Sequence, residues 1–124
     1  MKDPTSPVCR TISTLLARIG DKWTVLVVKT LGEGSKRFNE LRREIPSVSQ
    51  RMLTLTLRNL ERDGIVSRAV TPSIPPRVDY ALTDLGYSLL PPIMALSEWA
   101  LDNIEAIHEA QARFDAQSEE RAAA

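Results

Sequence analysis

The feature that most constrains the fold of this 124-residue chain is a proline between two closely spaced amphipathic segments. Phe38, Leu41 and Ile45 are spaced as on one face of a helix. Pro46 then disfavours helical backbone at the residue before it, so this helix has to end there. A second amphipathic helix is predicted over about 49–62, almost immediately afterwards. The sequence therefore predicts two helices joined by a tight turn.

The second of these helices has two contrasting faces. Its apolar face, which we expect to be buried, consists of Leu53, Leu57 and Leu60. The opposite face carries side chains suited to base edges and phosphates, because Arg pairs with guanine, Gln pairs with adenine and Leu packs on a thymine methyl group. The candidate DNA-binding residues of this helix are Ser49, Gln50, Arg51, Thr54, Leu55 and Arg58.

The N-terminal cap of this helix is ambiguous from sequence. Ser47 with Gln50 matches a capping box, whereas Ser49 could cap equally well. If Gln50 serves only the cap, the segment is an ordinary amphipathic helix with no recognition role. Both interpretations fit the periodicity.

The flanking segments complete a recognisable order of elements. Helices are predicted over about 8–19 and from a cap at Asp21 to Gly32. A short extended piece, 35–37, precedes the proline-bounded pair, and strands over 65–71 and 77–82 enclose a proline-rich loop. This order predicts an α+β, mostly α fold: a winged helix-turn-helix with a three-helix core, a β-hairpin wing and terminal dimerisation helices.

The C-terminal part of the chain is predicted to be helical in two pieces. Thr83 can cap a helix that starts at Asp84, and Pro91-Pro92 should interrupt it because an internal proline removes a hydrogen bond. A new helix is expected to begin at the prolines. We therefore expect a DNA-binding core over 8–83, dimerisation helices over 84–113 together with helix 8–19, and a frayed tail over 114–124.

Dimerisation is inferred from apolar surface that so small a domain cannot cover. The C-terminal helix and helix 8–19 each carry an apolar stripe at helical spacing. Pairing these stripes across a two-fold axis would bury them in a homodimer. The predicted interface residues are Ile12, Leu16, Ile93, Leu96, Trp99, Ala100, Ile104 and Ile107.

Charge is unevenly distributed, although the formal net charge is zero. Residues 36–83 carry nine Lys or Arg against five Asp or Glu, whereas residues 84–124 carry two against eight. Attraction to phosphates depends on the local field, because salt screens charges beyond about 8 Å. We expect Lys36, Arg37 and Arg77 to contact the DNA backbone near the wing. An ordinary solvated surface is the alternative explanation of the mixed charges.

Several functional classes are disfavoured by composition. One Cys and one His cannot supply the usual zinc ligands, so we expect no metal, and we see no motif for another cofactor. No nucleophile-elbow or glycine-rich phosphate loop occurs, so we do not expect an enzyme. No apolar run approaches the length of a membrane span, and no secretory signal is visible, so a cytoplasmic protein without a membrane partner is expected.

Five motifs in order resemble one family of regulators. They are Gly20-Asp21-Lys22-Trp23-Thr24, Arg37-Phe38-Asn39-Glu40-Leu41-Arg42, Ser49-Gln50-Arg51-Met52-Leu53, Leu60-Glu61-Arg62-Asp63-Gly64-Ile65-Val66 and Pro75-Pro76-Arg77-Val78-Asp79-Tyr80-Ala81-Leu82-Thr83. Over about residues 7–99 the chain closely resembles HxlR-type, MarR-like transcriptional regulators. The resemblance implies a bacterial winged-helix homodimer that binds inverted-repeat operators in double-stranded DNA.

The family resemblance also implies an effector response, with one departure. Members often carry a Cys-Pro pair before the first helix, and in some of them the thiol senses electrophiles or oxidants. Here the matching pair is Ser6-Pro7, and the single thiol, Cys9, lies three residues later. Cys9 is therefore a candidate redox sensor, near a helix start where protein thiols are often reactive. A structural cysteine without reactivity is the more common case.

Three hypotheses of function remain at this point. The first and favoured one is a sequence-specific dimeric transcription regulator, an activator or a repressor, that responds to a small molecule or an electrophile. The second is a winged helix used to bind proteins, against which the arginines of helix 49–62 argue. The third is a thiol-based enzyme or redox protein built on Cys9, against which the absence of a second Cys and of a Cys-His motif in the sequence argues.

Overall fold

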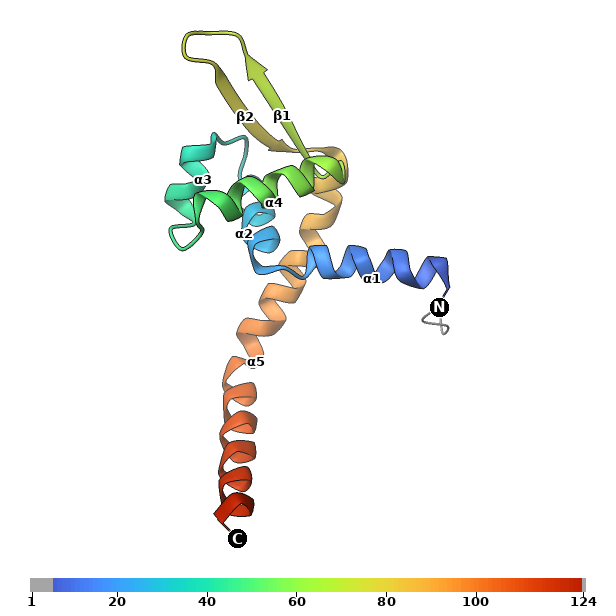
Figure 1. The fold of residues 1–124 in the computed structure, drawn as a ribbon, viewed down its shortest axis with the longest axis vertical. Helices are drawn as coiled ribbons and strands as arrows, with labels where there is room; N and C mark the ends of the chain where they lie inside the picture. Colours follow the sequence, from blue (N-terminus) through green and yellow to red (C-terminus); the bar gives the residue numbers. More distant parts are fainter. Residues whose placement is uncertain (1–5, 124) are drawn as a thin grey trace. The chain divides into compact units, whose positions relative to one another are not determined.

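A computed structural model describes residues 6–123 of the chain, and its elements follow the predicted order (Figure 1). The described residues form five helices and one antiparallel pair of strands. The elements are α1 (Pro7–Ile19), α2 (Lys22–Leu31), α3 (Phe38–Glu44), α4 (Gln50–Arg62), β1 (Val66–Thr71), β2 (Arg77–Leu82) and α5 (Asp84–Ala123). The winged helix-turn-helix predicted from sequence is confirmed.

The chain forms two compact units: one extends to Pro91 and the other starts at Pro92. The first unit has a core in which α2 packs against α3 and α4, while β1 packs against α4. This core is aliphatic, and its fully buried side chains include Val27, Val28, Leu31, Leu41, Leu53, Leu57, Leu60 and Val66. Removing these side chains from water is the main force that fixes the positions of α3 and α4.

The wing is a two-stranded hairpin tied to the segment before α3. Val66 pairs with Leu82 at its base, and Thr71 pairs with Arg77 toward its tip. Lys36 forms an isolated bridge with Tyr80, through backbone N–H···O distances of 2.9 and 2.8 Å. The predicted extended piece before α3 therefore acts as a third short strand and holds the wing beside α3 (Figure 1).

The junction between wing and C-terminal helix is fixed by Thr83. Its hydroxyl donates to the carbonyl of Gly64 at 2.6 Å and accepts from the amide of Gly86 at 3.1 Å. Gly86 allows a close approach, because a Cβ there would collide with the backbone oxygen of Ile65. Thr83 therefore caps α5, as the sequence predicts.

Two predictions about the C-terminal segment were wrong. The helix α5 is continuous through Pro91-Pro92, and it extends to Ala123, well past residue 113 where a frayed tail was expected. The prolines remove the amide donors for the carbonyls of Tyr87 and Ser88, but both residues are exposed, so water can replace those bonds. The last residue of the predicted tail, Ala124, lies outside the described residues.

No helix within residues 6–123 combines the length and the apolarity needed to cross a membrane.

Candidate nucleic-acid interface

The cap of α4 is Ser49, which resolves the ambiguity left by the sequence. Its Oγ accepts a hydrogen bond from the amide of Met52 at 3.1 Å. Gln50 is the first residue of the helix, is exposed, and takes no part in the cap. The Gln50 amide is therefore available for an external partner.

The two faces of α4 are separated as the periodicity predicts. Leu53, Leu57 and Leu60 are buried, together with Thr56. The predicted recognition residues are all exposed on the remaining surface of the same helix: Gln50, Arg51, Thr54, Leu55 and Arg58. Leu55 is 50% exposed, so this face carries one large aliphatic side chain among its polar ones. This face is therefore both basic and locally apolar.

The turn between α3 and α4 is anchored in the core. Ile45 and Val48 are both buried, and the amide of Val48 donates to the carbonyl of Ile45 at 3.1 Å. The amide of Ile45 in turn donates to Leu41 at 2.9 Å at the end of α3. Because both ends of the turn are fixed, α4 is presented as a rigid element.

Several arginines around α4 have no acidic partner. Within residues 6–123, Arg51, Arg58, Arg62 and Arg68 form no ion pair. Arg58 and Arg68 line a groove of about 370 Å³ between α4 and the wing, whose other walls include Glu61 and Tyr80. Unpaired guanidinium groups in a groove are well suited to bind the phosphates of a polyanion.

A second basic groove lies between the start of α3 and the start of β2, on the tip side of the wing. It has a volume of about 550 Å³, and Arg37, Arg43 and Arg77 line it. Arg77 is partly engaged, because its Nε lies 3.0 Å from Oδ2 of Asp79. Two of the predicted backbone contacts, Arg37 and Arg77, are thus brought together in one groove.

Lys36, the third predicted backbone contact, is engaged inside the chain instead. Its Nζ lies 3.1 Å from Oε2 of Glu44 and 3.5 Å from Oε2 of Glu33, and its side chain is only 15% exposed. The hydrogen bond to Glu44 raises the pKa of Lys36, and the charges of both carboxylates add to this effect. In the structure Lys36 thus belongs to an ion-pair cluster, because α3 brings Glu44 beside it, and we expect this cluster to compete with the predicted contact to the DNA backbone.

Arg43, Arg62 and Arg68 were not singled out from sequence. Arg43 joins the groove beside Arg37 only through the fold, and Arg68 reaches Arg58 only because β1 pairs with β2 next to α4. The positive balance of residues 36–83 was the one signal that pointed to them.

A different kind of surface is found on α1, where no residue is buried. Leu16 is 62% exposed, Val8 and Leu15 are also exposed, and Ile12 is half-buried. Arg18 fastens the end of this helix, since its Nη1 lies 2.7 Å from Oδ2 of Asp63. The apolar stripe predicted on α1 is thus left uncovered within the chain.

The distal part of α5 carries the second uncovered stripe. Most of its predicted interface residues are exposed, namely Leu96, Trp99, Ala100, Ile104 and Ile107. Ile93 is only 1% exposed, so it is a buried residue of the chain and its assignment to an interface is corrected. Phe114, 66% exposed, was missed because we expected a frayed tail. Ala100, Ile107 and Phe114 follow one another at intervals of seven residues, and this repeat could have identified Phe114 from the sequence.

Cys9 lies in the first turn of α1 and is partly buried. Its amide donates to Oγ of Ser6 at 3.1 Å, so Ser6 is the N-cap of the helix. Ser6 therefore has a structural role of its own in this chain.

Comparison with known proteins agrees with this architecture. The family model described as HxlR-like helix-turn-helix matches residues 18–108. An uncharacterized HTH-type transcriptional regulator, YdeP of Bacillus subtilis, is 42% identical over 106 residues, 81% of this chain and 83% of the relative. Another from Methanothermobacter thermautotrophicus is 49% identical over 88 residues, 71% of this chain and 67% of the relative.

Among solved structures, the redox regulator HypR in its reduced form is similar to this chain. The TM-score is 0.74 and the sequence identity 43%, over 80% of this chain and 98% of HypR.

Proposed function

Because the chain belongs to the HxlR-like helix-turn-helix family, it is a transcriptional regulator, and we propose that it binds double-stranded DNA as a homodimer. The relatives are named as regulators and not as enzymes. The single observation that carries the DNA-binding proposal is the exposed face of α4, where unpaired arginines surround Leu55 opposite a buried apolar face.

In the proposed complex, α4 occupies the major groove and reads base edges. Arg51 and Arg58 would pair with guanine, Gln50 with adenine, and Leu55 would pack on a thymine methyl group, with Thr54 beside them. The remaining contacts hold phosphates and set the register without reading sequence. They are Ser49 at the start of α4 and Arg37, Arg43, Arg68 and Arg77 around the wing.

The proposed dimer rests on the uncovered stripes of α1 and of distal α5. Val8, Leu15 and Leu16 on α1 are exposed, and so is the series Ala100, Ile107 and Phe114 on α5. A second copy of the chain would cover both stripes across a two-fold axis. A symmetric dimer would place two α4 helices about 34 Å apart, which matches inverted half-sites one helical turn apart.

The direct experiment is fluorescence anisotropy of the protein with DNA from upstream of its own gene, across a salt series. We expect binding that exceeds binding to random DNA, with log K falling against log salt by about 0.9 per phosphate contact. Binding without sequence preference and without salt dependence would contradict the proposal and favour a protein-binding winged helix.

Two arginine variants separate base reading from phosphate contact. Arg51→Ala should weaken operator binding by about 1–3 kcal/mol, roughly 5- to 150-fold, and relax specificity at one base pair. Arg43→Ala should weaken binding to all sequences alike and reduce the salt slope by about 1. Arg113→Ala, on the exposed distal part of α5, is the matched control and should change neither quantity. Equal effects of Arg51→Ala on cognate and mutated operators would contradict its role in base reading.

A redox response is a second candidate property. Its support is the similarity to the redox regulator HypR and the place of Cys9 in the first turn of α1, beside the proposed interface. An oxidant such as diamide would join two Cys9 thiols of a dimer in a disulfide, being itself reduced to the hydrazine. We expect diamide to change DNA affinity in the wild type and not in Cys9→Ser. An equal response in both proteins would exclude Cys9 as the sensor.

A further inference from the structure

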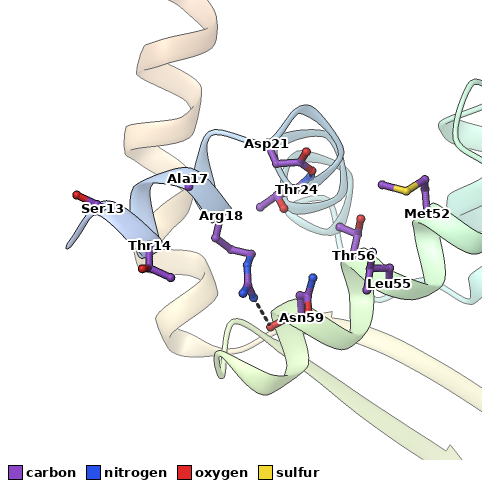
Figure 2. A pocket seen from close by; sticks show the side chains of 10 residues that line it. All are labelled: Ser13, Thr14, Ala17, Arg18, Asp21, Thr24, Met52, Leu55, Thr56 and Asn59. Atoms are coloured by element: carbon purple, nitrogen blue, oxygen red, sulfur yellow. Dashed lines mark hydrogen bonds between the residues drawn. The ribbon is translucent and has the colours of Figure 1, made fainter. Parts of the chain in front are cut away.

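An open, solvent-facing cavity of about 570 Å³ lies between α1, α2 and α4, within the first unit (Figure 2). This volume falls in the range of sites for small organic ligands, roughly 300–1,000 Å³. Apart from Leu55, no residue that lines it belongs to the proposed DNA contacts or to the proposed dimer stripes. One of its walls is α4 itself, which contributes Met52, Leu55, Thr56 and Asn59.

The cavity combines an apolar wall with unused hydroxyl groups. Met52 and Leu55 from α4 and Ala17 from α1 supply apolar surface. Thr24 and Thr56 are buried residues, and none of the side-chain hydrogen bonds within residues 6–123 involves either hydroxyl. Because no buried side-chain oxygen among these residues lacks a partner, both hydroxyl oxygens must reach the open space of the cavity. Each can donate one hydrogen bond and accept others. The site therefore suits a ligand that has an apolar body and a hydrogen-bonding group.

Two charged residues line the cavity, and of these Arg18 is ion-paired, whereas Asp21 forms no ion pair within residues 6–123. Nη1 of Arg18 lies 2.7 Å from Oδ2 of Asp63 and 3.4 Å from the carbonyl oxygen of Asn59. Oδ2 of Asp21 accepts the amides of Trp23 and Thr24 at 3.1 and 3.2 Å, at the start of α2. An anion would lose its hydration without gaining an unpaired cationic partner. The lining therefore favours a neutral ligand over an anion.

The cavity and the proposed dimer surface use opposite faces of α1. At 3.6 residues per turn, Ala17 lies on the far side of the helix from Ile12 and Leu15. A second copy of the chain that covers the apolar stripe would therefore leave the Ala17 side open.

From these features, we propose that the cavity binds a small, neutral aromatic molecule that bears an amide or a hydroxyl group. The apolar wall and the Met52 sulfur favour an aromatic ring, and the two threonines supply its hydrogen bonds. Leu55 is shared between this cavity and the proposed base-reading face. A ligand in the cavity therefore lowers DNA affinity. This effect on DNA rests on the proposed function, whereas the binding of the ligand to the cavity is independent of it.

Benzamide and its charged analogue benzoate are suitable probes of the free protein. In NMR titrations of methyl-labelled protein, benzamide should shift the Met52 and Leu55 methyl signals saturably, with a millimolar Kd expected for so small a ligand. Benzoate should bind at least 10-fold more weakly. Absence of a saturable shift with benzamide, or tighter binding of benzoate, would overturn the proposal.

Two variants locate the site. Ala17→Phe fills the cavity and should abolish the benzamide shifts, whereas Ala95→Phe adds the same ring at an exposed position of α5 and should not. Thr56→Val removes one buried hydroxyl with little change of shape and should weaken binding several-fold, while Thr11→Val on exposed α1 should not. Benzamide shifts that survive Ala17→Phe in the folded protein would place the ligand elsewhere and overturn the assignment.

The coupling to DNA is tested separately. Saturating benzamide should lower DNA affinity, and saturating DNA should lower benzamide affinity by the same factor. If the protein binds benzamide but no DNA, the proposed function fails and the cavity assignment stands. If it binds DNA but not benzamide, only the cavity assignment fails. Binding of both without mutual effect would refute the role of Leu55 as the shared residue.

Discussion

Helices α1 and α4 begin with the same kind of cap, but the apolar face of α4 is buried and that of α1 is not. Each has 13 residues, and each is capped by a serine whose Oγ accepts the amide three residues later at 3.1 Å. Both carry apolar residues at helical spacing. Yet α4 has four buried residues, whereas α1 has none.

The difference shows that amphipathicity alone does not reveal what an apolar face contacts. The core of the same chain covers the apolar face of α4, so its arginine-bearing face is left for an external partner. On α1 the apolar face itself is left uncovered, which is the basis for a contact with a second copy. Local sequence signals are alike in the two helices, and the tertiary context gives them different roles.

The largest effect is expected from truncating one leucine in each helix. Leu57→Ala should lower the free energy of unfolding by about 2–5 kcal/mol, because it leaves a cavity in the core. Leu16→Ala removes a side chain that the chain does not bury, so its effect should come only from a weakened dimer. Urea unfolding at two protein concentrations distinguishes the cases.

The loss caused by Leu57→Ala should be the same at both concentrations, whereas that of Leu16→Ala should fade as the dimer dissociates on dilution. Should Leu16→Ala cost as much as Leu57→Ala at every concentration, the stripe on α1 would belong to the core of a single chain. Sedimentation of the wild type as a monomer at micromolar concentration would remove the dimer altogether.

Much of the fold could be predicted because residues close to each element indicate where it begins and ends. Capping residues, glycines and the break at Pro46 delimit α1 to α4, and alternation marks β2. The predicted break at Pro91-Pro92 was wrong because it considered only the local effect of proline and not the helical residues on both sides of it. A helix that already extends in both directions tolerates two missing bonds when the freed carbonyls can reach water.

Burial and ion pairing were less accessible to sequence reasoning, because they depend on residues far apart in the chain. Ile93 and Leu96 belong to one predicted stripe, yet only the former is buried. Lys36 could not be distinguished from Arg37 until the fold brought Glu44 beside it. The exposed face of α4 was predictable because a single helix contains both of its faces.

A smaller effect is expected from removing the two serine caps. Ser49→Ala should cost about 1 kcal/mol of unfolding free energy, since α4 is part of the cooperative core. Ser6→Ala removes an equivalent bond from a helix with no buried residue. It should therefore increase amide hydrogen exchange in the first turn of α1 without lowering the stability of α4. Equal loss of global stability in both variants would show that α1 folds cooperatively with the core.

The smallest effect concerns the ion-pair cluster that holds the segment between α2 and α3. Glu44 raises the pKa of Lys36 above its ordinary value of 10.5, so Lys36 stays protonated to higher pH in the folded state than in the unfolded chain. The stabilisation is thus complete below 10.5 and is lost as the pH rises through the raised pKa. The difference in unfolding free energy between wild type and Lys36→Gln should be constant from neutral pH to 10.5 and should shrink above 10.5.

Lys29→Gln is the matched control, because Lys29 on α2 forms no ion pair within residues 6–123, and its difference from wild type should not shrink in the same range. Lys36→Gln should also leave DNA affinity and its salt slope almost unchanged, in contrast to Arg43→Ala. A loss of one unit of salt slope in Lys36→Gln would instead mean that the lysine leaves Glu44 to hold a phosphate. The ion-pair cluster would then be part of the DNA-binding surface, and the division between structural and binding charges around α3 would have to be redrawn.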